Sequence, residues 1–412
     1  MTDPRSTSGD RRHGPKWDEQ FTLTVGNDKA DLCGRDERVI QAAVDTVARM
    51  GGGTVRLLPA TFQLRNSVYL CSNLRLIGSG PDTVLVKEPS VTSKLAADSD
   101  WYDQEITLAD AKGFRVGDGI CLRATNPHHG GSTVIKRTLV ARSGNRFQLD
   151  KGLRENLWVG SKPTASTLFP LLSGEFVTQV TIENLALDGN KAHNEELDGN
   201  YAGCIFLQDC ADIAVRDVVA RNYNGDGISW QICHDVTVER CESRDHTGLG
   251  LHPGSGSQRP LIRGNKIIGN RIGLFFCWGV KYGLAEKNLI EDTKTAGISV
   301  GHRDTDNVIR GNTVKRSGQV GILFRPERGE GFTGDRNTIE GNLVVDSGDE
   351  SAAAVDIQGT TGGLVFNGNE LRETRGKAKR VGFRLGKDAK DVRLEENKVE
   401  GFATAVDDQR KR

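Results

Sequence analysis

No charge of either sign predominates in this sequence. Its 55 acidic and 55 basic side chains give a formal net charge of zero. Nucleic-acid and membrane-surface binding usually accompany a basic excess, so we expect neither nucleic acid nor a membrane as a partner. The sequence also lacks any run of about 18 apolar residues, and no segment is therefore predicted to cross a membrane.

The start of the chain lacks a signal-like segment. The first residues, MTDPRSTSGDRRHGPKWDEQ, contain no apolar core of the kind that secretory signals carry. We expect a cytoplasmic protein as the sequence is written, or a secreted one whose signal has been removed. Residues 1–30 are predicted to be a disordered lead-in.

Cysteine pairs spaced for metal binding are absent as well. The eight cysteines include no C-x-x-C pair, which argues against a zinc knuckle. Cys210 and Cys233 fall at equivalent points of a repeat, and we interpret such cysteines as small apolar residues of a core. No cofactor is predicted. Calcium is the weak alternative, because four acidic residues could supply oxygen ligands but follow no ligand spacing: Asp304, Asp306, Glu327 and Asp335.

Glycine, in contrast, is abundant at 50 residues, and it punctuates an internal repeat. A phrase of a small residue, an aliphatic, any residue and an apolar residue returns from residue 202 onward. Its aliphatic residues recur every 21 to 25 positions, at Ile205, Ile228, Leu249, Leu274, Ile298 and Ile322. Short alternating strands cannot bury their apolar faces alone, but stacked coils bury them together. The repeat predicts an all-β fold, a single-stranded right-handed parallel β-helix with these six residues inside.

A second phrase runs in phase with the first and ends in asparagine. It places asparagines at Asn184, Asn265, Asn288, Asn312, Asn342, Asn369 and Asn397. Buried amides need hydrogen-bond partners, and we expect these side chains to bond to one another up the stack.

The rest of the chain is interpreted around this solenoid. Residues 31–92 are predicted to hold a capping helix, Asp36 to Met50, and the first coils, because the open end of a solenoid needs a cover. Residues 93–165 break the rhythm and are predicted to be a small inserted β-subdomain. Coils then occupy residues 166–405, followed by a tail at 406–412.

Several phrases near the start resemble a known group of proteins. They are IQAAVD (40–45), GGGTV (51–55), LPATF (58–62) and NLRLIGSGPDTVL (73–85), and they look like the beginning of pectate-lyase-like β-helix proteins. That superfamily includes polygalacturonase-type hydrolases, pectate and alginate lyases, mannuronan C5-epimerases and phage tailspikes. The resemblance implies the fold and a polysaccharide or oligosaccharide substrate, whereas one fold hosts many chemistries.

The motifs of the sub-families are matched only in fragments. Asn224-Gly225-Asp226-Gly227 is similar to the Asn-Thr-Asp-Gly of polygalacturonases, but His246-Thr247 stands where these enzymes carry an Asp-Asp pair. Gly301-His302-Arg303 only partly matches their Gly-His-Gly. The epimerase phrase Tyr-Gly-x-Asp-Pro-His-Asp is reduced to a fragment around His252. No sub-family is identified.

Candidate site residues project outward along the first strand of each coil or lie at its ends. Their convergence on four successive coils is more typical of a site than of a scattered polar surface. The catalytic candidates are Asp226, Asp245, His252, His302 and Arg325. The substrate-binding candidates are Asn224, Gln231, His246, Trp278, Lys281, Arg303 and Glu327. His252 and Arg325 are expected in one outward row, and His128 and His129 are the next place to look.

Three functions are consistent with these residues. The first, slightly favoured, is glycoside hydrolysis by Asp226 and Asp245, whose carboxylates are expected roughly 8 Å apart, within the span of inverting glycosidases. The second is a polysaccharide lyase or C5-epimerase that uses His252 or His302 as a base and Arg325 to neutralise a uronate carboxylate. The third is a non-catalytic glycan-binding solenoid.

Overall fold

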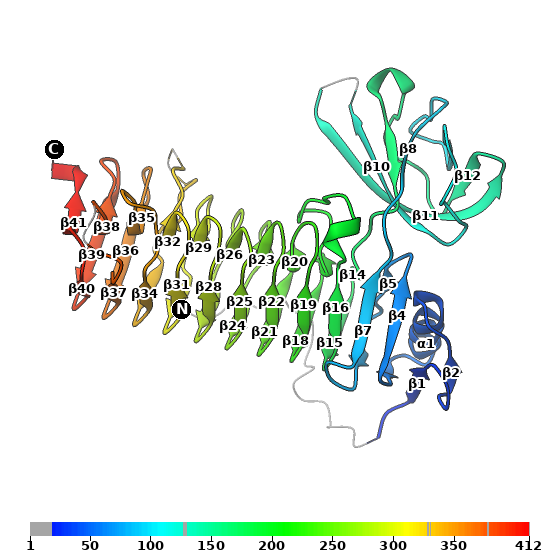
Figure 1. The fold of residues 1–412 in the computed structure, drawn as a ribbon, viewed down its shortest axis with the longest axis horizontal. Coiled ribbons are helices and arrows are strands. Elements are labelled where there is room, and N and C mark those ends of the chain that lie inside the picture. Colours follow the sequence, from blue (N-terminus) through cyan, green and yellow to red (C-terminus); the bar gives the residue numbers. More distant parts are fainter. Residues whose placement is uncertain (1–18, 127–129, 328, 330, 377–378, 412) are drawn as a thin grey trace.

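The computed structural model describes residues 19–126, 130–327, 329, 331–376 and 379–411. Stacked coils form a long rod, and a separate lobe projects from the rod near its N-terminal end (Figure 1). Each coil adds one strand to each of three parallel sheets. We name them sheets I, II and III in the order in which a coil of the repeat passes through them, and the turns between them the I–II, II–III and III–I corners.

Sheet I has eleven described strands. They are β5 (Val68–Tyr69), β14 (Leu172–Glu175), β17 (Ile205–Gln208), β20 (Ile228–Gln231), β23 (Leu249–Gly254), β26 (Ile272–Phe275), β29 (Ala296–Val300), β32 (Val320–Phe324), β35 (Ala353–Ile357), β38 (Val381–Leu385) and β41 (Thr404–Asp408).

Sheet II has thirteen described strands. They are β1 (Thr22–Gly26), β2 (Leu32–Cys33), β3 (Gly53–Leu57), β6 (Leu74–Ile77), β15 (Thr178–Glu183), β18 (Ala211–Arg216), β21 (His234–Glu239), β24 (Leu261–Arg263), β27 (Leu284–Glu286), β30 (Val308–Arg310), β33 (Thr338–Glu340), β36 (Gly362–Asn367) and β39 (Lys390–Glu395).

Sheet III has eleven described strands. They are β4 (Ala60–Leu64), β7 (Thr83–Lys87), β16 (Ala186–Asp188), β19 (Val219–Arg221), β22 (Glu242–Arg244), β25 (Lys266–Ile268), β28 (Leu289–Glu291), β31 (Thr313–Lys315), β34 (Leu343–Val345), β37 (Glu370–Arg372) and β40 (Lys398–Glu400). The predicted parallel β-helix is confirmed.

The aliphatic row of sheet I lies in the interior, with one correction to its register. Ile205 pairs with Ile228, and Ile228 pairs with Leu251 rather than with Leu249. The expected equivalence of Leu249 is therefore wrong by two residues. The sequence Gly248-Leu249-Gly250-Leu251 contains the small–aliphatic phrase twice, and a period of two keeps both leucines on the inward side. Both are buried.

Asparagines of the II–III corner form a hydrogen-bonded ladder along the axis. The side-chain oxygen of Asn312 accepts from the backbone N–H of Asn288 at 3.0 Å and from its Nδ2 at 2.9 Å. The Nδ2 of Asn312 in turn donates to Asn342 and to the carbonyl of Ala285, each at 2.9 Å. The pattern runs from Asn265 to Asn397. The sequence also predicts Asn184 in this ladder, but Asn184 does not belong to it. It occupies the preceding position of its corner, where the backbone is left-handed (φ 54°).

The N-terminal end of the rod is covered as predicted. Helix α1 (Glu37–Arg49) is capped by Asp36, which accepts from the N–H of Arg38, and its apolar face joins the core. The sequence predicts disorder for residues 1–30, but this is wrong for residues 22–26. They form β1, in which polar and apolar residues alternate and which pairs with β3. The expected C-terminal tail is also ordered within the described residues, through β41 and a short 3₁₀ turn, Gln409–Lys411.

The projecting lobe is the predicted insert. Its antiparallel sheet contains β8 (Thr92–Lys94), β9 (Glu105–Thr107), β10 (Gly119–Thr125), β11 (Ser132–Ser143), β12 (Arg146–Leu149) and β13 (Thr164–Ser166), followed in Figure 1 from blue to green. A 3₁₀ turn, Val159–Ser161, precedes β13. The lobe has a core of its own, and the coils resume beyond it, because β14 pairs directly with β5. None of the described helices is long and apolar enough to span a membrane.

Candidate functional site

The polar residues singled out in the sequence lie on the outward face of sheet I and at the two corners that border it. The sequence predicts His252 in the row of Arg325, but the structure pairs His252 with Ser229, and Phe275 with Ser299. His252 therefore belongs to the neighbouring outward row, because the register follows Leu251. Arg325 follows β32 two residues beyond the position that pairs with Ser299.

Asp226 and His252 form a buried hydrogen-bonded pair on this face. The Oδ2 atom of Asp226, just before β20, lies 2.8 Å from Nδ1 of His252 on β23. Its Oδ1 accepts the backbone N–H of Leu249 at 2.8 Å. The carboxylate at Nδ1 favours the imidazole tautomer that carries its proton there, which leaves Nε2 as an acceptor. That Nε2 is buried and has no hydrogen-bond partner among the described residues.

A segment of the III–I corner covers the pair. Gly199 lies against the Asp226 carboxylate so closely that a side chain at position 199 would overlap it. The Gly199 carbonyl accepts from Ser229 Oγ at 2.6 Å, and Ser229 Oγ accepts from Gln231 Nε2 at 3.0 Å. Asn224 Nδ2 holds the same segment through a bond to a backbone carbonyl at 2.8 Å. The Asp226 and His252 side chains are consequently only 4% and 3% exposed.

Arg325 is the centre of a second cluster, three coils beyond the coil of His252. Its guanidinium lies over the ring of Phe275 at 4.3 Å, and the same ring meets His252 edge-on at 5.6 Å. It also donates to Ser299 Oγ at 3.0 Å and to the carboxylate of Asp304 at 3.1 Å. Burial raises the pKa of Asp304 to about 6, against the opposing effect of the Arg325 charge and of backbone N–H donors. Phe275 thus separates a histidine from a cation on one face.

His302 and Trp278 lie at the I–II corner beside this cluster. Their rings stack with centroids 4.3 Å apart and an interplanar angle of 14°. Phe332 meets His302 edge-on, and the guanidinium of Arg303 lies over Phe332 at 4.3 Å. Glu327 Oε2 is 3.6 Å from His302 Nδ1. Trp278 is 60% exposed, so it is not a residue of the hydrophobic core.

Two expected site residues lie elsewhere than the sequence predicts. His246 is buried inside the corner, where its Nδ1 accepts the N–H of Tyr223 at 3.0 Å, and burial lowers its pKa to about 3. Asp245 aligns with Asn222, four residues before Asp226 rather than two, because Ile228 pairs with Leu251. Its carboxylate bonds to Arg244 at 2.9 Å. The register thus does not support the expected carboxylate separation.

The remaining predicted residues divide between the face and its surroundings. Lys281 lies past the corner, bridged to Thr305 at the edge of sheet II. His128 and His129 fall outside the described residues. The acidic residues considered for calcium are engaged with cations or backbone donors, as in the Arg336–Asp306 pair at 2.8 Å. Within the described residues no group of three or more His, Cys, Asp or Glu side chains is placed to hold a metal.

One residue that contributes to this face is not predicted by any pattern in the sequence. Lys136 of the insert reaches over the ring of Phe206, 3.9 Å from its centroid, and burial lowers the pKa of this lysine to about 8. Phe206 pairs with Ser229, so the insert meets the row that contains His252. A cavity of about 660 Å³ lies at this junction, between Lys136 and the sheet I residues Tyr69 and Ser173. Only the folding of the insert back onto sheet I creates it.

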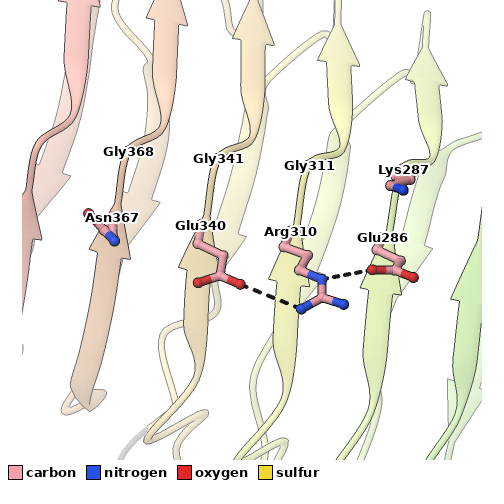
Figure 2. Close-up of a pocket in the computed structure, with 8 residues that line it drawn as sticks. All are labelled: Glu286, Lys287, Arg310, Gly311, Glu340, Gly341, Asn367 and Gly368. Carbon is pink, nitrogen blue, oxygen red and sulfur yellow. Dashed lines mark hydrogen bonds and ion pairs between the residues drawn. The ribbon is translucent and has the colours of Figure 1, made fainter.

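A smaller cavity of about 420 Å³ lies where sheet II meets the II–III corner. Glu286, Arg310 and Glu340 line it on successive strands of sheet II, next to turn glycines of the II–III corner (Figure 2). Arg310 bonds to Glu286 at 2.7 Å and to Glu340 at 3.9 Å. These charges compensate one another, so we interpret the cavity as an ion-pair ladder that joins coils.

Comparisons with known proteins agree on the fold. Residues 203–371 match the family described as right handed beta helix region. Similar solved structures include the surface adhesin PfbA of Streptococcus pneumoniae, with a TM-score of 0.57, 12% identity and 93% of each chain covered. The A-module of a mannuronan C-5 epimerase from Azotobacter vinelandii gives 0.54 and 14%, over 93% of this chain and 97% of that one.

A third similar structure is the tailspike of Pseudomonas phage phi297. It gives a TM-score of 0.50 and 11% identity, over 89% of this chain and 68% of that chain. No curated protein sequence matches the chain. The chain is therefore a right-handed parallel β-helix protein, and the similarity to an adhesin, an epimerase and a tailspike establishes no sub-family.

Proposed function

We propose that the protein is a carbohydrate-active enzyme that binds an acidic polysaccharide along sheet I and transfers a proton at a uronate unit. The observation that carries this proposal is the Asp226–His252 pair, with 2.8 Å between Oδ2 and Nδ1 and an unpartnered Nε2. An imidazole oriented by a carboxylate is a competent general base near neutral pH.

The proposed chemistry starts with removal of the proton on C5. His252 Nε2 takes this proton, and the positive charge of Arg325 beyond Phe275 stabilises the negative charge that develops on the uronate carboxylate. In a lyase the electron pair then forms the C4–C5 double bond and expels the C4 oxygen, which takes a proton from water and leaves as a hydroxyl group. In an epimerase water donates a proton to C5 from the opposite side. Both outcomes require the segment that carries Gly199 to move, because His252 is 3% exposed.

Hydrolysis by two carboxylates is the weaker alternative. It needs a second carboxylate facing Asp226 across the scissile bond, whereas Asp245 is displaced along the chain and bonds to Arg244. The fold similarity to an epimerase module and a tailspike is compatible with a glycan substrate but does not select a reaction.

A second candidate function is glycan binding without catalysis. The closed cover over Asp226 and His252 favours it, since Ser229 ties Gly199 in place at 2.6 Å. A β-helix with the surface role of an adhesin is among the similar structures. In that case the pair would be a structural device that joins two coils to the III–I corner.

One experiment separates these possibilities. The purified protein is incubated with alginate, polygalacturonate and hyaluronan in D₂O, and the products are analysed by ultraviolet absorbance of unsaturated uronate and by deuterium uptake at C5. We expect one of the two signals, and we expect it to be lost in His252→Gln and retained in His234→Gln, a change at a half-buried histidine of sheet II. Deuterium-free, uncleaved polymers would refute proton transfer, and new reducing ends without unsaturation would indicate hydrolysis.

A further inference from the structure

The I–II corner presents one residue from each coil within three positions of the end of its sheet I strand. Strand register aligns the preceding residues, and the row that follows them, which we call the corner row, is Phe176, Asp209, Ile232, Ser255, Trp278 and His302. Their φ angles are all positive, from 25° to 61°. Backbone bonds from Phe176 N to Gln208 O and from Ile232 N to Ser255 O, each 3.1 Å, link successive coils here.

The corner row contains bulky apolar side chains in a conformation that disfavours them. The left-handed region suits Gly, Asn and Asp, and a β-branched or bulky residue there is an outlier. In the described part of the chain, four large apolar or aromatic side chains other than histidine adopt it, at Phe176, Ile232, Trp278 and Tyr282, and three of these belong to the corner row. Those three are also 75%, 47% and 60% exposed. Neither backbone preference nor burial accounts for them, and strain retained at an exposed position indicates function.

The three side chains are spaced by two coils. Neighbouring parallel strands lie about 4.8 Å apart, so successive bulky residues are separated by about 9.6 Å. The small or polar residues Asp209 and Ser255 occupy the coils between them. Trp278 has one face covered by His302, and the residue is still 60% exposed. Bulky apolar side chains therefore alternate along the row with small or polar residues.

We propose that the corner row binds a linear polysaccharide that runs along the axis of the β-helix, with sugar rings packed against Phe176, Ile232 and Trp278. Flat apolar surfaces complement pyranose faces, and two coils correspond to the length of a disaccharide unit. Asp209 and Ser255 offer hydrogen-bond partners for the sugar hydroxyl groups that lie between these bulky side chains.

A glycan chain fits the corner row better than a second protein does. The row is one residue wide, whereas a stable protein interface buries about 800 Å² on each partner. It also borders the candidate site, because Gln231 directly precedes Ile232. The inference rests on the proposed function in one respect, namely that the same polymer reaches both the corner row and sheet I.

The test uses asparagine substitutions, which relieve the backbone strain and therefore preserve folding. The triple variant Phe176→Asn, Ile232→Asn, Trp278→Asn is compared with the full-length protein by native electrophoresis in gels that contain alginate, polygalacturonate or hydroxyethyl cellulose. We expect retardation of the parent protein by at least one polymer, and binding weaker by about tenfold or more in the triple variant. Tyr282→Asn removes the fourth bulky left-handed residue, outside the row, and is expected to leave retardation unchanged.

The outcomes separate the corner row from the enzyme proposal. His252→Gln should abolish conversion of the polymer and leave gel retardation intact. Conversion therefore tests the proposed enzyme, and retardation tests the corner row independently of it. Equal retardation of the triple variant and the parent, or no retardation of the parent by any of the three polymers, would overturn the inference. Sedimentation velocity supplies a further check. A parent dimer that the triple variant dissociates would assign the row to a second copy of the chain and overturn it too.

Discussion

Arg325 holds a carboxylate that is completely withdrawn from solvent. Its Nη2 donates to Asp304 at 3.1 Å, and the Asp304 side chain is 0% exposed while that of Arg325 is 15% exposed. Asp304 occupies the corner position that is filled by Cys233, Ser257 and Val280 in the three preceding coils. A charge has thus replaced the small uncharged residues of this stack, and Arg325 compensates it from the outward face.

Removal of that compensation should be costly. We expect Arg325→Gln to lower the free energy of unfolding by about 3 kcal/mol near pH 7.5, because Asp304 is left as a buried carboxylate without a cation. The matched control is Arg316→Gln at the exposed Arg316–Asp292 pair, for which about 0.5 kcal/mol or less is expected. Burial raises the pKa of Asp304 to about 6, so the cost for Arg325→Gln should shrink at about pH 5, where the carboxyl is neutral. Urea titrations at both pH values measure it, and equal costs for the two variants would contradict the prediction.

Lys87 should give the protein a stability that rises with pH. Its Nζ is buried, donates to Thr167 O at 2.8 Å and to Asn194 Oδ1 at 2.6 Å, and burial lowers its pKa to about 7. Between about pH 7 and pH 10 the unfolded chain binds a proton that the folded chain does not, so the free energy of unfolding increases with pH by roughly 3 kcal/mol.

The check on Lys87 is a comparison of slopes. Urea unfolding at about pH 7 and about pH 9.5 is measured for the parent, for Lys87→Met and for Lys94→Met, which changes an exposed lysine. The increase with pH should be smaller in Lys87→Met than in the other two proteins. Parallel curves for all three would show that Lys87 stays protonated in the fold.

An asparagine of the ladder should contribute least to stability where water can replace its hydrogen bonds. Asn312→Ala removes partners from Asn288, Asn342 and the Ala285 carbonyl in a dry corner, and we expect a loss of about 3 kcal/mol in the free energy of unfolding. Asn397→Ala at the half-buried end of the ladder should cost about 1 kcal/mol. Denaturant titration of the two variants checks the order, and a larger loss at Asn397 would contradict it.

Asp226→Asn should change the tautomer of His252. The amide oxygen can still accept from Leu249 N, but its NH₂ group then faces Nδ1 of His252 and favours an acceptor there. We expect the proton to move to Nε2, proposed activity to be lost, and the free energy of unfolding to fall by about 1 kcal/mol. Nitrogen chemical shifts of the labelled imidazole report the tautomer directly.

The sequence predicted those features that repeat and missed those that occur once. Recurring aliphatics and asparagines defined the coils, and the interval from Asp36 to Met50 became α1 with Asp36 as its cap. The register failed at Leu249, since alternation alone does not distinguish it from Leu251. His246 was assigned outward because its buried corner position depends on the same register. The contact of Lys136 with Phe206 depends on how the insert packs, which no local pattern encodes.

The insert also bears on the order in which the chain can fold. Each C-terminal strand pairs with one a single coil away, as Ile205 does with Ile228, but Leu172 must find Val68 across the whole insert. Loop-closure entropy grows with the length of the closed segment, by roughly 0.6 kcal/mol for each doubling, and non-local pairings slow folding. The coils beyond residue 172 can therefore nucleate and zip together locally, while the capped first coil docks last, once the insert has folded and brought β5 to β14. Translation releases the N-terminal coil first. Its strands therefore have an unpaired edge until the coils beyond residue 172 have been synthesised and have folded.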